Sequence, residues 1–419
     1  MQNAKFIRWE GNIIMKKFAQ LVCTTALILA TMVGCGNSSD DSSGGSGDET
    51  QETIKIAFVG PLTGESSASP LKGLNGALLA AQQCNEEGGI LGGRMIEIVS
   101  FDDRKNVDEA CAIADKISAD PSIVGVSYAQ ANSTLALATG PIYQENGVPA
   151  VTVMASHPDV AEIGKFEMRN NTTDYFESLN SVQIAYNSGY RKIFYVGAET
   201  DYGVSCSVQT EEATQMVVDQ AGQDMALIGS VTYLTGTVDY AAEIAQVMAS
   251  DADVILLSSG YEQDAPFIKQ LRKAGCDLPV IVHGNCYDPM FAEIGGEVVE
   301  GVLMPTLFDV TSTNPKVVKF VKEYNDVYGE DPNFVSALTY DSTWQMIKAI
   351  EAAGTTDREA VCDKMYEVEF DGVTGVIIYD ENHECIAPQV AVKVENGQLV
   401  EAKDLIYPSW EEFIAAIKK

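Results

Sequence analysis

The sequence contains few histidines and lacks the short motifs that mark common catalytic sites. Only three histidines occur in 419 residues, His157, His283 and His383, and they lie far apart in the chain. Their scarcity weakens the case for a zinc site or a histidine base, because both draw on imidazole groups. No complete GxSxG, no phosphate-binding GxxxxGK[ST] and no helix-opening GxGxxG is present. We therefore expect no metal, no cofactor and no enzymatic reaction.

Basic residues are scarce as well. The chain has 27 Lys and Arg against 60 Asp and Glu, a formal net charge of −33. Nucleic-acid binding needs a cationic surface, so this balance argues against it. It argues equally against electrostatic attraction to anionic lipid. The plain interpretation of the acidity is a solvated, soluble surface.

The cysteines do not indicate a disulfide framework. Of the nine, seven follow Cys35, an odd number, and no CxxC pair occurs. Some of these seven could pair, but nothing in their spacing predicts a set of bridges.

No apolar run after residue 35 is long enough to span a membrane, but a short one precedes it. Lys16 and Lys17 are followed by an uncharged, apolar stretch over 18–34, which ends in the sequence MVGC at Cys35. A basic start, an apolar run and a small residue before a cysteine are similar to the lipobox of bacterial lipoproteins. An ordinary signal peptide, or a buried helix with an incidental cysteine, are the alternatives.

The start of the chain is therefore interpreted as an export signal and an anchor. We predict that 1–34 is a signal peptide whose true start is Met15, and that Cys35 carries lipid. Residues 35–53 are rich in Ser, Gly, Asp and Glu, a composition typical of a flexible linker. The expected location is the outer face of the cytoplasmic membrane, with a Gram-positive bacterium as the expected source.

From Ile54 onward, short apolar strands alternate with longer helical patterns. Residues 54–60 are predicted as a strand that ends in glycine, and 73–87 as a helix with one apolar face. The alternation is repeated over 176–282, and 334–353 is predicted as a helix. Repetition of strand, helix and strand predicts parallel sheets covered by helices on both faces. The length of the body favours two domains, with ligands bound beyond the carboxyl ends of the strands.

Several segments resemble type I periplasmic binding proteins, in particular the leucine/isoleucine/valine-binding receptors of ABC transporters. The opening strand and loop IKIAFVGPLTG at 54–64 and the glycine turn NEEGGILGG at 85–93 match the start of that pattern. TDYG at 200–203, FDGVTG at 370–375 and YDEN at 379–382 match later parts of it. The similarity extends over essentially all of the chain after residue 53.

The resemblance implies an α/β fold of two lobes, each a parallel sheet flanked by helices, joined by three crossovers. Lobe 1 is predicted as 54–170 plus 306–369, and lobe 2 as 171–305 plus 370–419. The implied function is to bind an amino acid, or a related small carboxylate or amide, in the cleft between the lobes. Partners would be the membrane through Cys35 and separate ABC permease and ATPase subunits. A sensor that signals to a membrane receptor is the alternative, and a surface hydrolase a less favoured one.

Specific residues are implied as ligand contacts. The family holds the ligand carboxylate with a hydroxyl and backbone N–H groups after the third and fourth strands, where Ser133, Ser156 and the backbone of Met154 stand. Free N–H groups at a helix amino terminus suit an anion. Ser133 equally suits a plain helix N-cap. Tyr202 and Tyr261, from the other lobe, are expected to close over the ligand.

Two positions depart from the family pattern. Asn285 stands where the amino-acid binders have an acidic residue for the α-ammonium group. An Asn cannot neutralise a buried ammonium, and an unpaired buried charge is costly. Either Asp288 or Glu262 replaces it, or the ligand has no ammonium group. Ser69 is small where the branched-chain binders carry an aromatic side chain.

Overall fold

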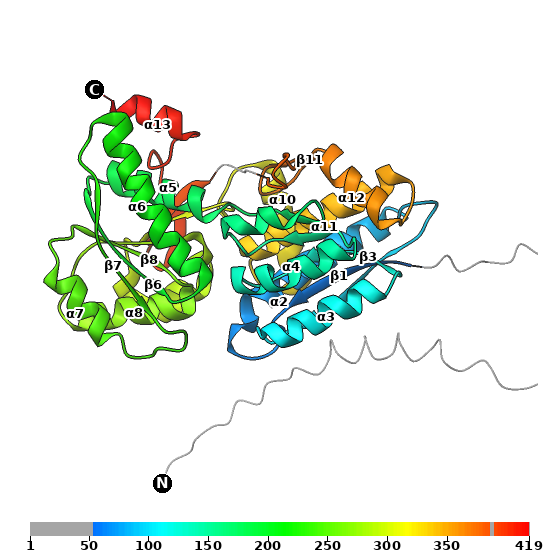
Figure 1. Ribbon diagram of the computed structural model, residues 1–419, viewed down its shortest axis with the longest axis horizontal. Helices are drawn as coiled ribbons and strands as arrows, with labels where there is room; N and C mark the ends of the chain where they lie inside the picture. Colours follow the sequence, from blue (N-terminus) through cyan, green and yellow to red (C-terminus); the bar gives the residue numbers. More distant parts are fainter. Residues whose placement is uncertain (1–52, 386–388, 419) are drawn as a thin grey trace, which may run out of the picture. The chain divides into compact units, whose positions relative to one another are not determined.

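The computed structural model describes residues 53–385 and 389–418 (Figure 1). The predicted signal peptide, the lipidation site Cys35 and nearly all of the predicted linker lie outside the described residues. Those predictions therefore stay predictions. Among the helices that are described, none combines the length and the apolar character that crossing a membrane requires.

The first sheet has five parallel strands in the order β2-β1-β3-β4-β5. Along the β1–β2 pair, Ile54 lies opposite Ile96 and Gly60 opposite Asp102. The carboxyl ends of these strands therefore lie along one edge. The strands are β1 (Ile54–Gly60), β2 (Ile96–Asp102), β3 (Ile123–Tyr128), β4 (Ala150–Thr152) and β5 (Glu167–Arg169).

Strand β1 shows why helices cover both faces of this sheet. Ile54, Ile56 and Phe58 share one buried core with α2 (Ala68–Glu86) and α11 (Phe334–Ala353). Ala57 and Val59 share another with α3 (Val107–Ala119) and α4 (Ser133–Glu145). Successive strand residues point to opposite faces, so a strand with apolar residues on both faces needs cover on both sides.

The second sheet has seven strands in the order β14-β13-β10-β9-β8-β6-β7. Strands β6 to β10 are parallel, whereas β13 pairs antiparallel with β10 and β14. The strands are β6 (Lys192–Ala198), β7 (Ala226–Tyr233), β8 (Val254–Ser258), β9 (Val280–Val282), β10 (Leu303–Thr306), β13 (Val390–Glu395) and β14 (Gln398–Glu401).

Helices also cover both faces of the second sheet. Ile193 and Tyr195 of β6 share a core with α5 (Asp174–Asn187), α6 (Asp201–Ala221) and α13 (Trp410–Ile417). The alternate residues Phe194 and Val196 share a core with the helices on the opposite face. Those helices are α7 (Ala241–Ala249), α8 (Tyr261–Lys273) and α9 (Pro289–Gly295).

The hairpin of β11 (Phe370–Asp371) and β12 (Val376–Ile377) is held on the helices of the first sheet. The carboxylate of Asp341, in α11, accepts the backbone N–H groups of Val373 and Thr374 at 2.9 and 2.8 Å. A further bridge joins Arg169 of β5 to Glu384. The hairpin therefore packs on elements of the first sheet's layer, and the lobe boundaries remain a prediction.

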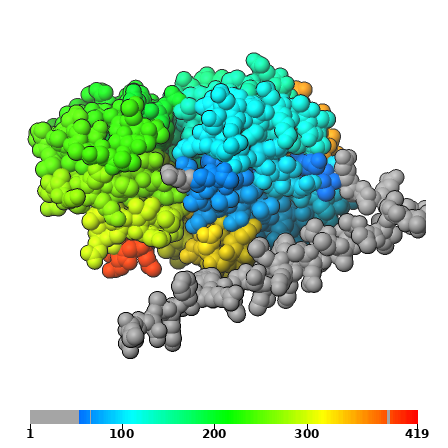
Figure 2. Space-filling view, turned by 90° about the horizontal axis from the view of Figure 1, so that it is seen from below, coloured from blue at the N-terminus to red at the C-terminus, as the bar shows by residue number. Residues whose placement is uncertain are grey.

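The remaining elements are short or peripheral. They are α10 (Pro315–Tyr328), α12 (Arg358–Glu367), and the 3-10 helices η1 (Glu65–Ser67), η2 (Pro158–Ile163), η3 (Gly284–Cys286) and η4 (Gly296–Val299). In the space-filling view, the blue and cyan surface of the first sheet's layer adjoins the green and yellow surface of the second (Figure 2). The predicted α/β class, with parallel sheets flanked by helices, is confirmed.

Candidate functional site

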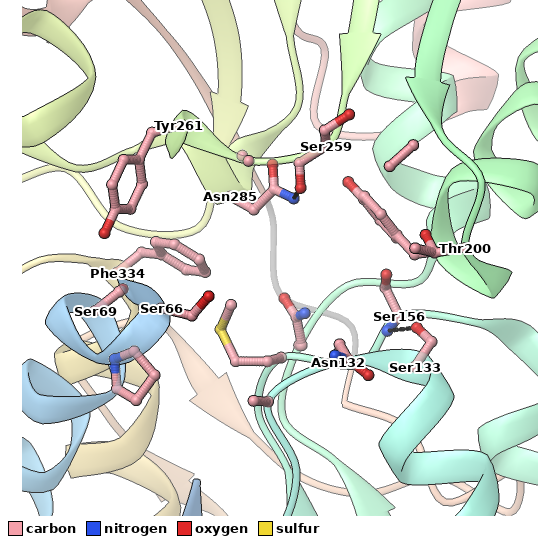
Figure 3. A pocket seen from close by; sticks show the side chains of 18 of the residues that line it. Ser66, Ser69, Asn132, Ser133, Ser156, Thr200, Ser259, Tyr261, Asn285 and Phe334 are labelled. Atoms are coloured by element: carbon pink, nitrogen blue, oxygen red, sulfur yellow. Dashed lines mark hydrogen bonds between the residues drawn. The ribbon is translucent and has the colours of Figure 1, made fainter. Parts of the chain in front are cut away.

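A cavity of about 370 Å³ lies at the carboxyl ends of the parallel strands of both sheets (Figure 3). Loops that follow β1, β3 and β4 line one side of it, and loops that follow β6, β8 and β9 line the other. Ligands of open parallel sheets bind beyond this edge of the strands. The position of the cavity is therefore that of a binding site.

All but one of the ligand contacts predicted from the sequence line this cavity. Asp288 does not: it is 1 % exposed, and its carboxylate accepts the Met290 N–H and the Asn333 side-chain N–H at 2.9 and 2.7 Å. Its oxygens therefore cap α9 and hold α11. The predicted residues that do line the cavity are Ser69, Ser133, Met154, Ser156, Tyr202, Tyr261, Glu262 and Asn285.

The amino terminus of α4 forms a donor-rich end of the cavity. Asn132, not Ser133, is the N-cap, because its side chain accepts the Leu135 N–H at 2.9 Å. The Ser133 hydroxyl oxygen accepts the N–H of Ser156 at 3.3 Å (Figure 3) and the N–H of His157 at 3.3 Å. Both of its lone pairs are thus engaged, and its hydrogen is left to donate. The free N–H groups of the first helical turn add donors and a favourable dipole for an anion.

The same end of the cavity joins elements of the two sheets. The Thr134 hydroxyl, at the start of α4, donates to the Asp201 carboxylate at the start of α6, with an O–O distance of 2.7 Å. An added Cβ at Gly203 would clash with the Ala198 carbonyl, so the first turn of α6 lies directly against the end of β6. This close approach sets the position of Tyr202, the residue before Gly203.

The opposite wall comes from the loops after β8 and β9. Asn285 donates through its Nδ2 to the Ser259 carbonyl at 3.1 Å, while its Oδ1 is buried and accepts no hydrogen bond from a described residue. Figure 3 shows Asn285, Ser259 and Tyr261 on the side of the cavity that faces Ser133 and Ser156. A buried amide oxygen without a donor is an unsatisfied acceptor.

The far end of the cavity is mixed in character. Phe334 and Tyr261 supply aromatic surface, and Ser69 and Ser66 lie beside them (Figure 3). The Ser69 hydroxyl accepts the side-chain N–H of Asn333 at 2.8 Å. This end could enclose an aliphatic or aromatic group, but it also contains hydroxyls.

Two charged side chains line this part of the cavity from different sheets. Lys105, in the loop after β2, donates to the Ser66 hydroxyl at 3.4 Å. Glu262 lies in the first turn of α8, and burial raises its pKa while the charge of Lys105 opposes that rise. The charge of Lys105 therefore offsets only part of the effect of burial on Glu262.

One buried carboxylate at the cavity, that of Glu177, was not predicted from the sequence. Glu177 of α5 is 5 % exposed and lines the cavity. Its carboxylate accepts the Gly284 N–H at 2.6 Å and the Tyr202 hydroxyl at 3.1 Å. The Tyr202 oxygen also lies 3.0 Å from His283 Nδ1. Burial raises the pKa of Glu177 to about 7 and lowers the pKa of His283 to about 4, so this histidine is neutral.

Glu177 belongs to no motif, which is why it was missed. It stands between Phe176 and Ser178, in a stretch that also contains Asp174, so its position in the sequence does not indicate that it lines a cavity.

The described part of the chain, 53–385 and 389–418, contains no group of three or more His, Cys, Asp or Glu side chains placed to hold a metal ion. The seven cysteines within it are free thiols. The groups that the cavity presents are hydroxyls, backbone N–H groups, amides, aromatic rings, two carboxylates and one ammonium. They can bind a small polar solute by hydrogen bonds and charge.

Comparison with known sequences identifies the family. The model of the family of periplasmic binding proteins matches residues 53–398. A relative from Pseudomonas aeruginosa, named a leucine-, isoleucine-, valine-, threonine- and alanine-binding protein, is 25% identical over 335 residues. The match covers 79% of this chain and 86% of the relative.

Solved structures show the same fold. The crystal structure of a leucine-binding protein from Thermotoga maritima has a TM-score of 0.76 and 29% identity, over 84% of this chain and 98% of that one. A branched-chain amino acid transporter substrate-binding protein from Streptococcus pneumoniae, solved with isoleucine, has a TM-score of 0.75 at 22% identity, over 83% and 98%. At 22% identity, the similarity to the Streptococcus pneumoniae protein supports a shared fold and nothing further. This chain belongs to the periplasmic binding protein family, as the sequence predicted.

Proposed function

We propose that this protein is an extracytoplasmic receptor of an ABC importer, and that it binds an amino acid or a related small carboxylate or amide in the cavity. The observation that carries the proposal is the convergence of the Ser133 hydroxyl and the amino terminus of α4 on one end of a cavity lined from both sheets. A ligand held there would contact both halves of the fold and would favour their closure around it.

The carboxylate of the ligand would lie at Ser133. A hydrogen bond to a charged group contributes about 1.5–3 kcal/mol, more than a neutral one. The Ser133 oxygen is positioned by two backbone N–H groups, so its hydroxyl is oriented before the ligand arrives. Pre-orientation lowers the entropy cost of binding.

The importer role rests on the family and on the export signal. Several relatives are named as binding proteins for leucine, isoleucine and valine. Lipid on Cys35 would hold the receptor at the outer face of the membrane, near a permease. Replacement of Cys35 by serine should release the protein from the membrane fraction into the medium. Retention of the variant in the membrane would contradict the lipid anchor.

Ligand binding can be tested by thermal shift. The purified protein is heated alone and with each member of a panel of amino acids, aromatic acids and small amides. A ligand at 100 times its dissociation constant should raise the free energy of unfolding by about 2.7 kcal/mol. The variant Ser133→Ala should lose most of this shift, while Ser207→Ala, a change in α6 outside the cavity lining, should keep it. Absence of a shift across the whole panel would contradict the receptor role.

A further inference from the structure

The two carboxylates of the cavity have different electrostatic surroundings. Glu262 faces Lys105, whose charge opposes the effect of burial on its pKa. Glu177 has no Lys or Arg facing it among the described residues. Among the described residues, the basic side chain that pairs with it is His283, whose Nδ1 lies 3.5 Å from Glu177 Oε2. Burial lowers the pKa of His283, so this histidine is neutral. A buried carboxylate without a cation is unfavourable when it ionises.

The groups around Glu177 do not supply the missing positive charge. Tyr202 and Cys206 face it from α6, and burial raises the pKa of both side chains, so both stay neutral. Asp174 lies one turn earlier in α5, and Cys286 follows β9. Asp174 is acidic, and burial raises its pKa as well, so it supplies no positive charge either. A cation in the cavity would therefore be attracted to Glu177.

Glu177 also has room to accept further hydrogen bonds. Its Oε1 accepts the Gly284 N–H and its Oε2 accepts the Tyr202 hydroxyl, whereas a carboxylate has about four acceptor sites. The next residue after Gly284 is Asn285, whose buried Oδ1 has no donor among the described residues. The hydrogen bond from the Gly284 N–H to Glu177 therefore holds two acceptors at the same part of the cavity. One is the acidic side chain of Glu177, and the other is the neutral side chain of Asn285.

We propose that Glu177 is the counter-ion for a protonated amine of the ligand, and that Asn285 supplies a neutral second acceptor through Oδ1. This inference rests on the proposed function and narrows it: with the carboxylate at Ser133, the ligand is a zwitterionic amino acid and not a plain carboxylic acid. Asn285 then needs no negative charge of its own, because the acidic group reaches the ligand from α5 instead.

Proton release is a consequence of this arrangement. Burial raises the pKa of Glu177 to about 7 in the ligand-free protein, so part of the molecules carry its proton near neutral pH. A bound ammonium group favours the ionised form and lowers this pKa, so binding expels the proton. The affinity should therefore rise with pH up to about 8 and fall up to tenfold per pH unit below about 6.

Matched ligand pairs test the assignment. L-leucine, L-alanine and L-phenylalanine are titrated against the protein by calorimetry, each beside the 2-hydroxy acid of the same side chain. Glu177→Gln should weaken the amino acid that the wild-type protein binds by at least about 30-fold, the loss expected when one partner of a buried charge pair is neutralised. Glu262→Gln, in the other cavity carboxylate, tests the alternative counter-ion, and Glu401→Gln, in an exposed carboxylate of β14, is the control that should leave the affinity unchanged.

The assignment has clear contrary results. Glu177→Gln with wild-type affinity, or a loss that appears in Glu262→Gln instead, would overturn it. Equal wild-type affinity for an amino acid and its hydroxy acid would also overturn it and leave the receptor role standing. Binding of neither class would count against the receptor role as well.

A second measurement needs no substitution. Titration of the wild-type protein at pH 6 and at pH 8, each in two buffers of different ionisation enthalpy, gives the number of protons released on binding, which should be larger at pH 6 than at pH 8. No release at either pH would overturn the assignment even if the Glu177→Gln protein did not fold.

Discussion

Replacement of Glu167 by glutamine should stabilise the protein at alkaline pH and leave its stability almost unchanged at pH 5. Glu167 lies in β5 and is 1 % exposed. Its Oε1 accepts the Thr152 hydroxyl at 2.6 Å, but its Oε2 is buried and accepts no hydrogen bond from a described residue. Burial raises the pKa of this carboxyl to about 8. A neutral side chain therefore suits this site better than a charged one.

The sign and size of the effect follow from the two pKa values. Between about 4.5 and 8, the folded protein holds the Glu167 proton and the unfolded chain releases it. The free energy of unfolding must then fall as the pH rises, by about 1.4 kcal/mol per pH unit from this residue. Glutamine cannot titrate, so Glu167→Gln removes this loss. At pH 8 the variant should be more stable than the wild-type protein by roughly 3–4 kcal/mol.

Urea unfolding at pH 5, 6.5 and 8 measures this difference. Glu401→Gln, which neutralises an exposed carboxylate in β14, is the matched control and should shift the midpoint by little at each pH. A Glu167→Gln protein that is destabilised equally at all three values would refute the reasoning. So would a wild-type stability whose pH dependence the substitution does not change.

Three other substitutions have defined outcomes. Asp341→Ala leaves the N–H groups of Val373 and Thr374 without their acceptor and should lower the free energy of unfolding by about 2–4 kcal/mol in urea; a loss below 1 kcal/mol would contradict the anchoring role of this carboxylate. Gly203→Ala introduces a clash with the Ala198 carbonyl and should cost about 1–3 kcal/mol of stability and weaken ligand binding through Tyr202; unchanged stability would mean that the first turn of α6 can shift freely. Ser133→Ala should weaken the binding of a carboxylate ligand by about 10-fold or more in calorimetry, and it should also lower the melting temperature of the ligand-free protein, because the N–H groups of Ser156 and His157 lose their acceptor; equal affinity would remove Ser133 from the site.

The fold could be predicted because its pattern is local. The mostly apolar strand at 54–60 and the helical spacing after it need only neighbouring residues to be recognised, and both are present as β1 and α2. The helix begins at Ala68 rather than at Gly73, because Pro70 is tolerated in a first turn and does not mark a boundary there. Strand β10 was not predicted, since its four residues include Pro305 and carry no periodic signal.

The site could be predicted only in part, for a related reason. Ser133 follows a strand and opens a helix, a position that the sequence alone reveals. Glu177 becomes part of the cavity through Gly284, which is 107 residues away, and through Tyr202, which is 25 residues away. No pattern within α5 shows that these contacts exist. The same holds for Asp288, whose carboxylate is engaged by Asn333 of the segment that opens α11.

The most direct test of the central claim is a calorimetric titration of the purified protein at pH 8 with each common L-amino acid. We predict saturable, one-to-one binding of at least one of them, strongly weakened both in Ser133→Ala and in Glu177→Gln. Binding of no amino acid, or binding that survives in a protein carrying both substitutions, would contradict a zwitterion held between the start of α4 and the buried carboxylate of α5.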